Sequence, residues 1–203
     1  MSENSYVHLV KPGQAGQPIF FVFHGTGGDE NQFFDFGSRM LPNATVVSPR
    51  GDVSEHGAAR FFRRKAEGLY DLDDLERATE RMAAFVAAHK ALHQSTAVIG
   101  LGFSNGANIL ASLLISHPDL FDASVLMHPL IPFEPKEGAG MAGRQVLITA
   151  GERDPICPVA LTQALADYFG RQQAEVTLDW HNGGHEIRQS EIEAVRAFLG
   201  SYA

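Results

Sequence analysis

Several segments of this chain that can form strands are apolar or small along almost their whole length, rather than at every second position. Residues 18–23 read PIFFVF and residues 95–102 read STAVIGLG. A strand with no polar face is buried on both sides, which is typical of a parallel sheet covered by helices. This pattern therefore predicts an α/β protein with a mostly parallel central sheet.

The rest of the chain continues an alternation of strands and helices. Further strands are predicted at 44–48, 122–127, 145–150 and 174–180, and helices at 30–41, 72–92, 105–117, 158–169 and 187–199. We expect the second helix to bury an apolar stripe that runs from Leu72 to Leu92. Such alternation is typical of a sheet with helices on both faces. Residues 50–70 and 129–143 have no clear period, and loops of this length are often functional.

The length of 203 residues fits a single domain over residues 1–203, with no separate cap domain. The net charge of −8 disfavours nucleic acid and anionic membranes as partners, because phosphate binding needs a cationic face. Cys157 is the sole cysteine, and the sequence shows neither a secretory signal nor an apolar run that could span a bilayer. We therefore expect a cytoplasmic protein that needs no cofactor, and the sequence leaves a homodimer open.

The motif Gly102-Phe103-Ser104-Asn105-Gly106 joins a predicted strand to a predicted helix. It matches the pattern G-x-S-x-G, in which a sharp turn exposes the serine hydroxyl and the flanking glycines avoid steric clashes. The helix N-terminus behind Ser104 also favours negative charge at the site. Ser104 is therefore the candidate nucleophile, and the alternative is a serine that only caps the helix.

Two further polar residues follow strand ends in the order that such a serine requires, first an acid and then a histidine. Asp154 comes after one predicted strand, and His185 comes after the last strand and two glycines. His185 would take the proton of Ser104, and Asp154 would fix the tautomer of the imidazole. Glu152 is the rival acid, and His181 is the rival base.

A glycine-rich loop, His24-Gly25-Thr26-Gly27-Gly28-Asp29, follows the first strongly apolar strand. In a serine hydrolase two N–H groups bind the oxyanion, one directly after the nucleophile and one from such a loop. The backbone amides of Asn105 and Thr26 are the candidates, and His24 is expected to orient the loop. A phosphate-binding loop is excluded here because its lysine is absent.

Taken together, these motifs resemble the small carboxylesterase/phospholipase family of α/β-hydrolases, which includes the acyl-protein thioesterases. The likeness rests on HGTGGDE at 24–30, SPRG at 48–51, RFFRR at 60–64, GFSNGA at 102–107, GERDPICP at 151–158 and NGGHEI at 182–187. Within the family, the chain is most similar to a bacterial branch associated with hydroquinone and quinone resistance. Dienelactone hydrolases are a more distant likeness, and they carry a cysteine nucleophile where this chain has Ser104.

The resemblance implies a minimal α/β-hydrolase fold and the activity of a carboxylesterase-type serine hydrolase. Ser104, Asp154 and His185 would form the triad, and Thr26 and Asn105 the oxyanion hole. Small or medium carboxylic esters would be cleaved through a covalent acyl-serine intermediate. An acyl thioesterase is the alternative among enzymes, and a non-catalytic ligand-binding protein is the alternative outside them.

The substrate pocket is expected to draw on the two irregular segments. Arg60, Phe61 and Phe62 in the first segment, and Ile131 in the second, are the candidate substrate-binding residues. The alternative is that the phenylalanines only anchor the loop and that Ile131 packs in the core. Cys157 is expected to be a small buried apolar residue, and no metal site is expected.

Overall fold

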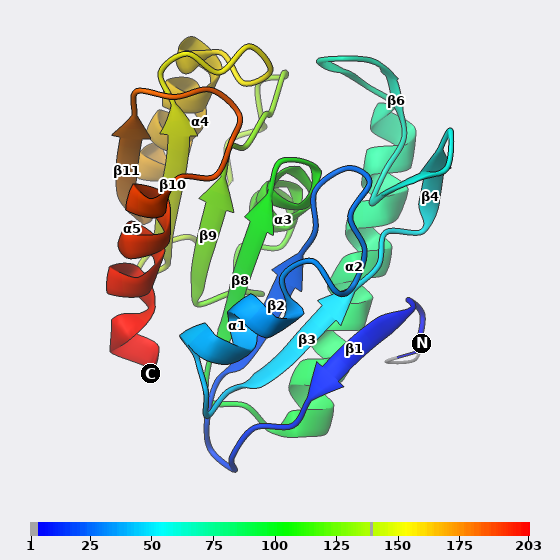
Figure 1. Cartoon of the computed structure of the whole chain (residues 1–203), viewed down its shortest axis with the longest axis vertical. Helices are drawn as coiled ribbons and strands as arrows, with labels where there is room; N and C mark the ends of the chain where they lie inside the picture. The colour runs from blue at the N-terminus through cyan, green and yellow to red at the C-terminus, as the bar shows by residue number, and fades with distance from the viewer. Residues whose placement is uncertain (1–3, 139) are drawn as a thin grey trace.

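The computed structural model describes residues 4–138 and 140–203, which fold around a seven-stranded sheet (Figure 1). In spatial order the strands are β1 (His8–Lys11), β3 (Thr45–Pro49), β2 (Ile19–Phe23), β8 (Val98–Phe103), β9 (Ala123–Met127), β10 (Gln145–Gly151) and β11 (Glu175–His181). β1 is antiparallel to β3, and the other neighbours in the sheet are parallel. The carboxyl ends of the parallel strands therefore share one edge, where sheets of this kind place their ligands.

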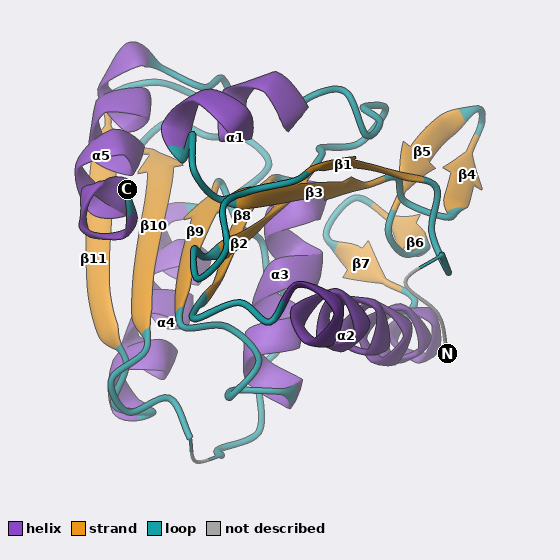
Figure 2. Ribbon diagram, turned by 90° about the horizontal axis from the view of Figure 1, so that it is seen from below, coloured by secondary structure: helices purple, strands orange, loops and turns teal. Residues whose placement is uncertain are grey.

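Helices cover both faces of this sheet, as Figure 2 shows. They are α1 (Phe34–Met40), α2 (Leu72–His93), α3 (Asn105–Ser116), α4 (Val159–Arg171) and α5 (Gln189–Leu199), followed by a 3-10 turn over Gly200–Tyr202. α2, α3 and α4 pack on one face, and α1 and α5 pack on the other. Within residues 4–138 and 140–203, no helix combines the length and the apolar character needed to cross a bilayer.

Alternate side chains of the central strands supply the two halves of the core. In β2, Phe21 and Phe23 belong to the cluster with α2, α3 and α4, whereas Phe20 and Val22 belong to the cluster with α1 and α5. Each of these side chains has 0% of its surface exposed. A strand that is buried on both sides needs such an unbroken apolar sequence, so the predicted mostly parallel α/β sheet is confirmed.

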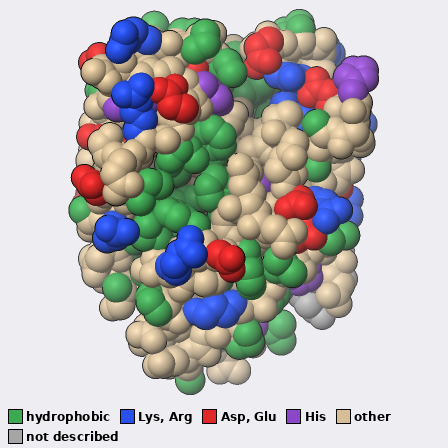
Figure 3. Space-filling view, in the orientation of Figure 1, with side chains coloured by type: hydrophobic (Ala, Val, Ile, Leu, Met, Phe, Trp, Pro, Cys, Tyr) green, Lys and Arg blue, Asp and Glu red, His purple; other side chains and the backbone are tan. Residues whose placement is uncertain are grey.

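The face that carries α1 and α5 is mixed in character (Figure 3). Lysine, arginine, aspartate and glutamate side chains are interspersed on it, and a band of hydrophobic side chains lies between the two helices. Phe36 and Phe198 are among the partly buried side chains that pack against the core on this side. The layer made by α1 and α5 therefore leaves part of the apolar core accessible.

The structure also differs from the sequence prediction. Residues 50–70 form two hairpins, β4 (Val53–Glu55) with β5 (Ala58–Arg60) and β6 (Arg64–Ala66) with β7 (Leu69–Tyr70), whose strands are too short to show a period. The edge strand β1 is absent from the prediction for the same reason. The expected burial of Leu72 and Leu92 is wrong, because they are 54% and 60% exposed at the two ends of α2.

Candidate active site

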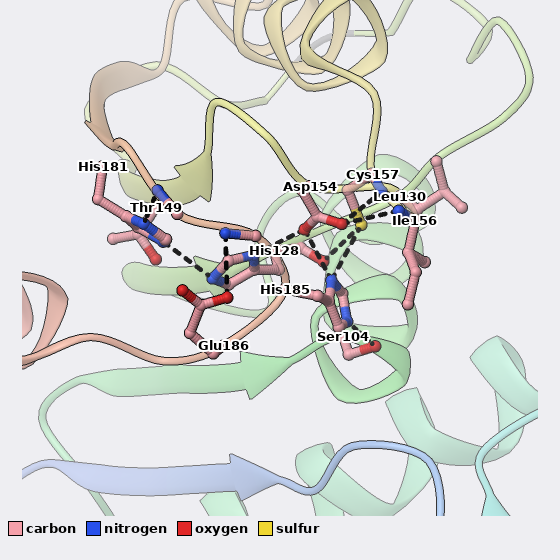
Figure 4. A network of polar contacts seen from close by, with 12 residues as sticks. Ser104, His128, Leu130, Thr149, Asp154, Ile156, Cys157, His181, His185 and Glu186 are labelled. Carbon is pink, nitrogen blue, oxygen red and sulfur yellow. Dashed lines mark hydrogen bonds and ion pairs between the residues drawn. The ribbon is translucent and has the colours of Figure 1, made fainter.

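Ser104 lies in a sharp turn between β8 and α3, at the carboxyl edge of the sheet (Figure 4). Its backbone has φ 51° and ψ −115°, a strained conformation for a residue with a side chain. A Cβ atom at Gly102 would lie within 2.6 Å of the Ala107 nitrogen, and one at Gly106 would lie within 2.6 Å of the His24 carbonyl oxygen. The two glycines of the predicted motif are therefore needed for the turn that presents the partly exposed Ser104.

Side chains from three loops meet at this edge. His185 Nε2 lies 2.9 Å from Ser104 Oγ, and His185 Nδ1 lies 2.7 Å from Asp154 Oδ2. Asp154 comes from the loop between β10 and α4, and His185 comes from the loop between β11 and α5. The structure thus brings together the serine, histidine and aspartate that the sequence pointed to. The rival Glu152 is exposed, and the rival His181 pairs with a different carboxylate.

The Asp154 carboxylate is fully buried but accepts hydrogen bonds on both oxygens. Oδ1 accepts from the backbone amides of Ile156 (2.8 Å) and Cys157 (3.0 Å), and Oδ2 accepts from His185 and from His128 Nδ1 (2.8 Å). Burial alone would raise the pKa of Asp154, but these hydrogen bonds, led by that of His128, outweigh burial and lower the pKa. Asp154 is therefore an anion that holds the Nδ1–H of His185 and leaves Nε2 as a proton acceptor.

His24 holds the glycine-rich loop after β2 in place. Its Nδ1 atom donates to the carbonyl oxygen of Gly25 (2.7 Å), and its Nε2 atom accepts from the amide of Gly51 (2.8 Å). Burial lowers the pKa of His24, which favours the neutral form that this pair of hydrogen bonds requires. The ring also packs on Phe61, with centroids 4.6 Å apart. His24 therefore has the orienting position that the sequence suggested.

Both predicted oxyanion donors belong to residues that line one cavity with Ser104. The amide of Asn105 is in the first turn of α3, where N–H groups have no partner within the helix. Hydrogen bonds connect the residues around both donors to β5 and to Phe61, which follows it. Ala59 O accepts from Gly27 N (3.0 Å), Arg60 Nη1 donates to Thr26 Oγ1 (2.7 Å), and Phe61 N donates to Asn105 Oδ1 (2.8 Å). The first hairpin thus supports the side of the site where an oxyanion would lie.

The cavity beside Ser104 has a volume of about 240 Å³. Arg60 lines it, as expected. The prediction that Phe61 and Phe62 contact substrate is not supported, because they are 1% and 0% exposed and belong to the core under α2 and α3. Ile131 lines a different cavity, against α4. An aromatic run in an irregular segment does not reveal which way its side chains point, and here they point inward.

The two irregular segments supply further lining residues, as expected, and these are Arg64, Glu67, Tyr70 and Leu130. Asn108 and Ile156 also line the cavity and have no counterpart in the sequence prediction. Tyr70 Oη donates to the carbonyl oxygen of Leu130 (2.7 Å) and accepts from Asn108 Nδ2 (2.8 Å). Asn108 Oδ1 accepts from the amide of Leu130 (2.6 Å). This closed ring of hydrogen bonds fixes one wall of the cavity. Asn108 could have been found from its spacing, because it lies one helical turn after Ser104.

Cys157 is buried, with 1% of its surface exposed, and its Sγ atom lies 3.8 Å from His185 Nδ1. Burial raises the pKa of the thiol, so the reactive thiolate is disfavoured. This environment agrees with the expectation of a small buried apolar residue.

A second cluster of polar side chains lies behind Asp154. His128, His181 and Glu191 place ring nitrogens and carboxylate oxygens close enough together to suggest metal ligands. The hydrogen bonds argue otherwise. His181 Nδ1 accepts from the amide of Gly183 (3.0 Å), so the proton of the neutral ring is on Nε2, which then has no lone pair to offer a metal ion. The cluster is therefore a hydrogen-bonded network, and it is absent from the sequence prediction.

Comparisons with known proteins agree with this geometry. The model of the dienelactone hydrolase family matches residues 54–193. The chain is 36% identical over 191 residues to "Putative hydrolase MhqD" of Bacillus subtilis (strain 168), an alignment that covers 93% of this chain and 95% of that protein.

Solved structures give the same result. The Bacillus cereus carboxylesterase is 33% identical with a TM-score of 0.93, over 98% of this chain and 96% of that one. Protein Atu2452 of Agrobacterium tumefaciens str. C58, whose function is unknown, is 64% identical with a TM-score of 0.98 over 100% of both chains. These likenesses confirm the α/β-hydrolase fold. The carboxylesterase structure agrees with the family that the motifs resembled. The family model that matches is that of the dienelactone hydrolases, which the motifs had suggested as the more distant likeness.

Proposed function

The chain belongs to the dienelactone hydrolase family and is a hydrolase of the carboxylesterase type. We propose that it cleaves carboxylic esters through an acyl-Ser104 intermediate. The observation that carries the proposal is the continuous chain of hydrogen bonds from Ser104 through His185 to Asp154. It gives the serine a base and gives the base a fixed tautomer.

In the first half of the reaction, Ser104 Oγ attacks the ester carbonyl carbon while His185 Nε2 takes the hydroxyl proton. The carbonyl oxygen becomes an oxyanion between the amides of Asn105 and Thr26. When the tetrahedral intermediate collapses, the C–O bond to the alcohol breaks and His185 returns the proton to the leaving oxygen. The alcohol departs and the acyl group stays on Ser104.

In the second half, a water molecule takes the place of the alcohol. His185 accepts a proton from the water as its oxygen attacks the acyl carbon, and the same amides hold the new oxyanion. Ser104 leaves with the proton that His185 returns, and a carboxylic acid is released. Asp154 stays ionised throughout and stabilises the imidazolium that forms twice.

The cavity limits the substrates that this site can hold. Its volume of about 240 Å³ is below the usual range of about 300–1,000 Å³ for ligand pockets. Its walls combine apolar side chains, such as Leu130 and Ile156, with the guanidinium groups of Arg60 and Arg64. We therefore infer that short acyl groups are preferred over long ones.

The proposal is tested with the Ser104→Ala variant and a panel of p-nitrophenyl esters of increasing acyl length. Turnover should fall by about five to six orders of magnitude, by analogy with a serine protease, and a fluorophosphonate should label the native chain but not the variant. Thioesters of matched acyl length separate an esterase from a thioesterase. A variant that keeps near-native turnover, or a native chain that resists labelling, would exclude the proposal.

A further inference from the structure

The side of Asp154 that faces the protein interior contacts a second histidine, which the reaction above does not use. His128 follows β9 directly, is fully buried, and places Nδ1 2.8 Å from Asp154 Oδ2, the oxygen that also binds His185 (Figure 4). Its backbone φ is 52°, a left-handed conformation that a residue with a side chain adopts only when its surroundings enforce it. The structure therefore holds this imidazole in place at an energetic cost.

The other nitrogen of His128 faces a second buried carboxylate. His128 Nε2 lies 3.1 Å from Glu191 Oε1, and both side chains have 0% exposure. Glu191 also accepts from Thr149 Oγ1 (2.7 Å), from the amide of Arg188 (2.8 Å) and from His181 Nε2 (3.1 Å). Each of these groups is a donor, so the carboxylate is satisfied as an anion with no proton of its own.

The two carboxylates around the imidazole favour a proton on each of its nitrogens, because His128 Nε2 lies nearer to Glu191 Oε1 (3.1 Å) than to His181 Nε2 (3.4 Å). Nδ1 faces the Asp154 anion, and Nε2 faces the Glu191 anion. A neutral ring would turn a lone pair, in place of a donor, toward one of the two carboxylates, in a place that water does not reach. Burial acts to lower the pKa of His128, but the hydrogen bonds to Glu191 and Asp154 outweigh it and raise the pKa.

We propose that His128 is a positioning residue that remains an imidazolium, clamps the Asp154 carboxylate, and sets the net charge that His185 faces. With His128 charged, the buried group of Asp154, His128 and Glu191 carries one negative charge. The protonated His185 that forms during turnover brings it to neutrality. With His128 neutral, His185 would face two negative charges, and its proton would be held too tightly to be returned to the leaving group. The part of the inference that concerns rate rests on the proposed function.

Several titratable side chains surround His128. They are Asp154 and Cys157 from the loop before α4, His181 at the end of β11, His185 in the loop after β11, and Glu191 on α5. The His128 and His185 rings have centroids 5.1 Å apart. At that distance, removal of the positive charge of His128 should strengthen the hold of the buried group on the proton that His185 takes during turnover.

The first experiment measures the ionisation of His128 directly. Nitrogen-15 NMR of histidine-labelled protein between pH 6 and 9 distinguishes a ring with two N–H groups from a neutral tautomer, and His128→Asn assigns the signals by their loss. We expect both ring nitrogens of His128 to remain protonated at pH 8. A bare Nε2 at that pH would overturn the proposal. So would a Zn²⁺ titration that shifts the His128 and His181 signals together.

The second experiment measures how kcat/KM for p-nitrophenyl acetate depends on pH. His128→Asn keeps an N–H group where Nδ1 was but removes the charge, and we expect its acid limb to move up by about one to two pH units. His117→Asn is the matched control, because His117 pairs with the exposed Glu80 far from the site, and its profile should be unchanged. A lower kcat with no shift of the limb would reduce His128 to a structural role and refute the charge effect.

If His128→Asn does not fold because Glu191 has lost its partner, the double variant with Glu191→Gln removes the unpaired charge. This variant restores the single negative charge of the native group, so its acid limb should lie at the native position, and a limb displaced upward would refute the charge effect. The NMR result on the native chain stands in either case. It also separates the two proposals. A failure of the Ser104→Ala test would not change the protonation of His128, and a neutral His128 found by NMR in the native chain would not bear on whether Ser104 is the nucleophile.

Discussion

Replacing Asp154 by asparagine should inactivate the enzyme through the histidine tautomer rather than through loss of shape. Oδ1 of Asp154 accepts from the amides of Ile156 and Cys157, so the amide oxygen of asparagine must take that position. The new NH₂ group then occupies the place of Oδ2. There it faces the Nδ1 atoms of both His185 and His128, which donate to that oxygen in the native chain.

Two donors that face each other force His185 to give up its Nδ1 proton and to carry the proton on Nε2 instead. Nε2, which lies 2.9 Å from Ser104 Oγ, can then no longer accept the serine proton. The corresponding change in a serine protease lowers kcat by about 10⁴, which is about 5.5 kcal/mol in the activation free energy. We expect a loss of the same order for Asp154→Asn.

The assay is the hydrolysis of p-nitrophenyl acetate at pH 7.5, with a thermal melt of each variant to establish that it is folded. Glu152→Gln is the matched control, because Glu152 is an exposed acid two positions earlier in the same loop. Its activity should be native. An Asp154→Asn variant that is folded and retains more than a tenth of native kcat would refute the tautomer argument.

Two further predictions concern stability. Gly106→Ala should lower the unfolding free energy by at least about 1–3 kcal/mol in urea titrations, because its Cβ would lie within 2.6 Å of the His24 carbonyl oxygen. Gly170→Ala is the control, since Gly170 lies in α4 with no atom near its Cβ, and this change should be neutral or stabilising. Equal effects of the two substitutions would contradict the steric argument. The pKa values of Asp154 and Glu191 are held below their ordinary 3.8 and 4.5 because hydrogen bonds outweigh burial, so their contribution is present above those values and is lost as pH falls through the lowered ones. Melting temperatures between pH 7 and 3 should therefore drop below about pH 4.5, less steeply in Glu191→Gln, and an unchanged slope in that variant would contradict the linkage.

The parts of the fold that the sequence predicted are those where local pattern and burial coincide. An unbroken apolar run such as 18–23 can be satisfied only between two helical layers, and Ser104 and Asp154 each follow a buried strand at its carboxyl end. His185 follows the carboxyl end of β11, which is only partly buried. The hairpins in 50–70 were not predicted, because strands of two or three residues have no measurable period. Their side-chain directions therefore could not be predicted either.

His128 and Glu191 illustrate a different limit. His128 did carry a signal, because it follows a buried strand at the same edge as the triad residues. Glu191 carried none, since an acid in the first turn of a helix is common on protein surfaces. Only the packing of α5 against β10 and β11 shows that this acid is buried and faces the histidine. Pairings between residues far apart in sequence, and the charge states they impose, need coordinates.

The attachment of the first hairpin to the oxyanion loop has a consequence for how this enzyme can change. Residues 59–61 form hydrogen bonds with the residues that surround both oxyanion donors, and Arg60 also lines the cavity. A substitution that reshapes this wall for a new ester would shift the donors by the same movement. Evolution or engineering of selectivity through this segment is therefore coupled to turnover, whereas the wall formed by Leu130 and Ile156 can vary more independently.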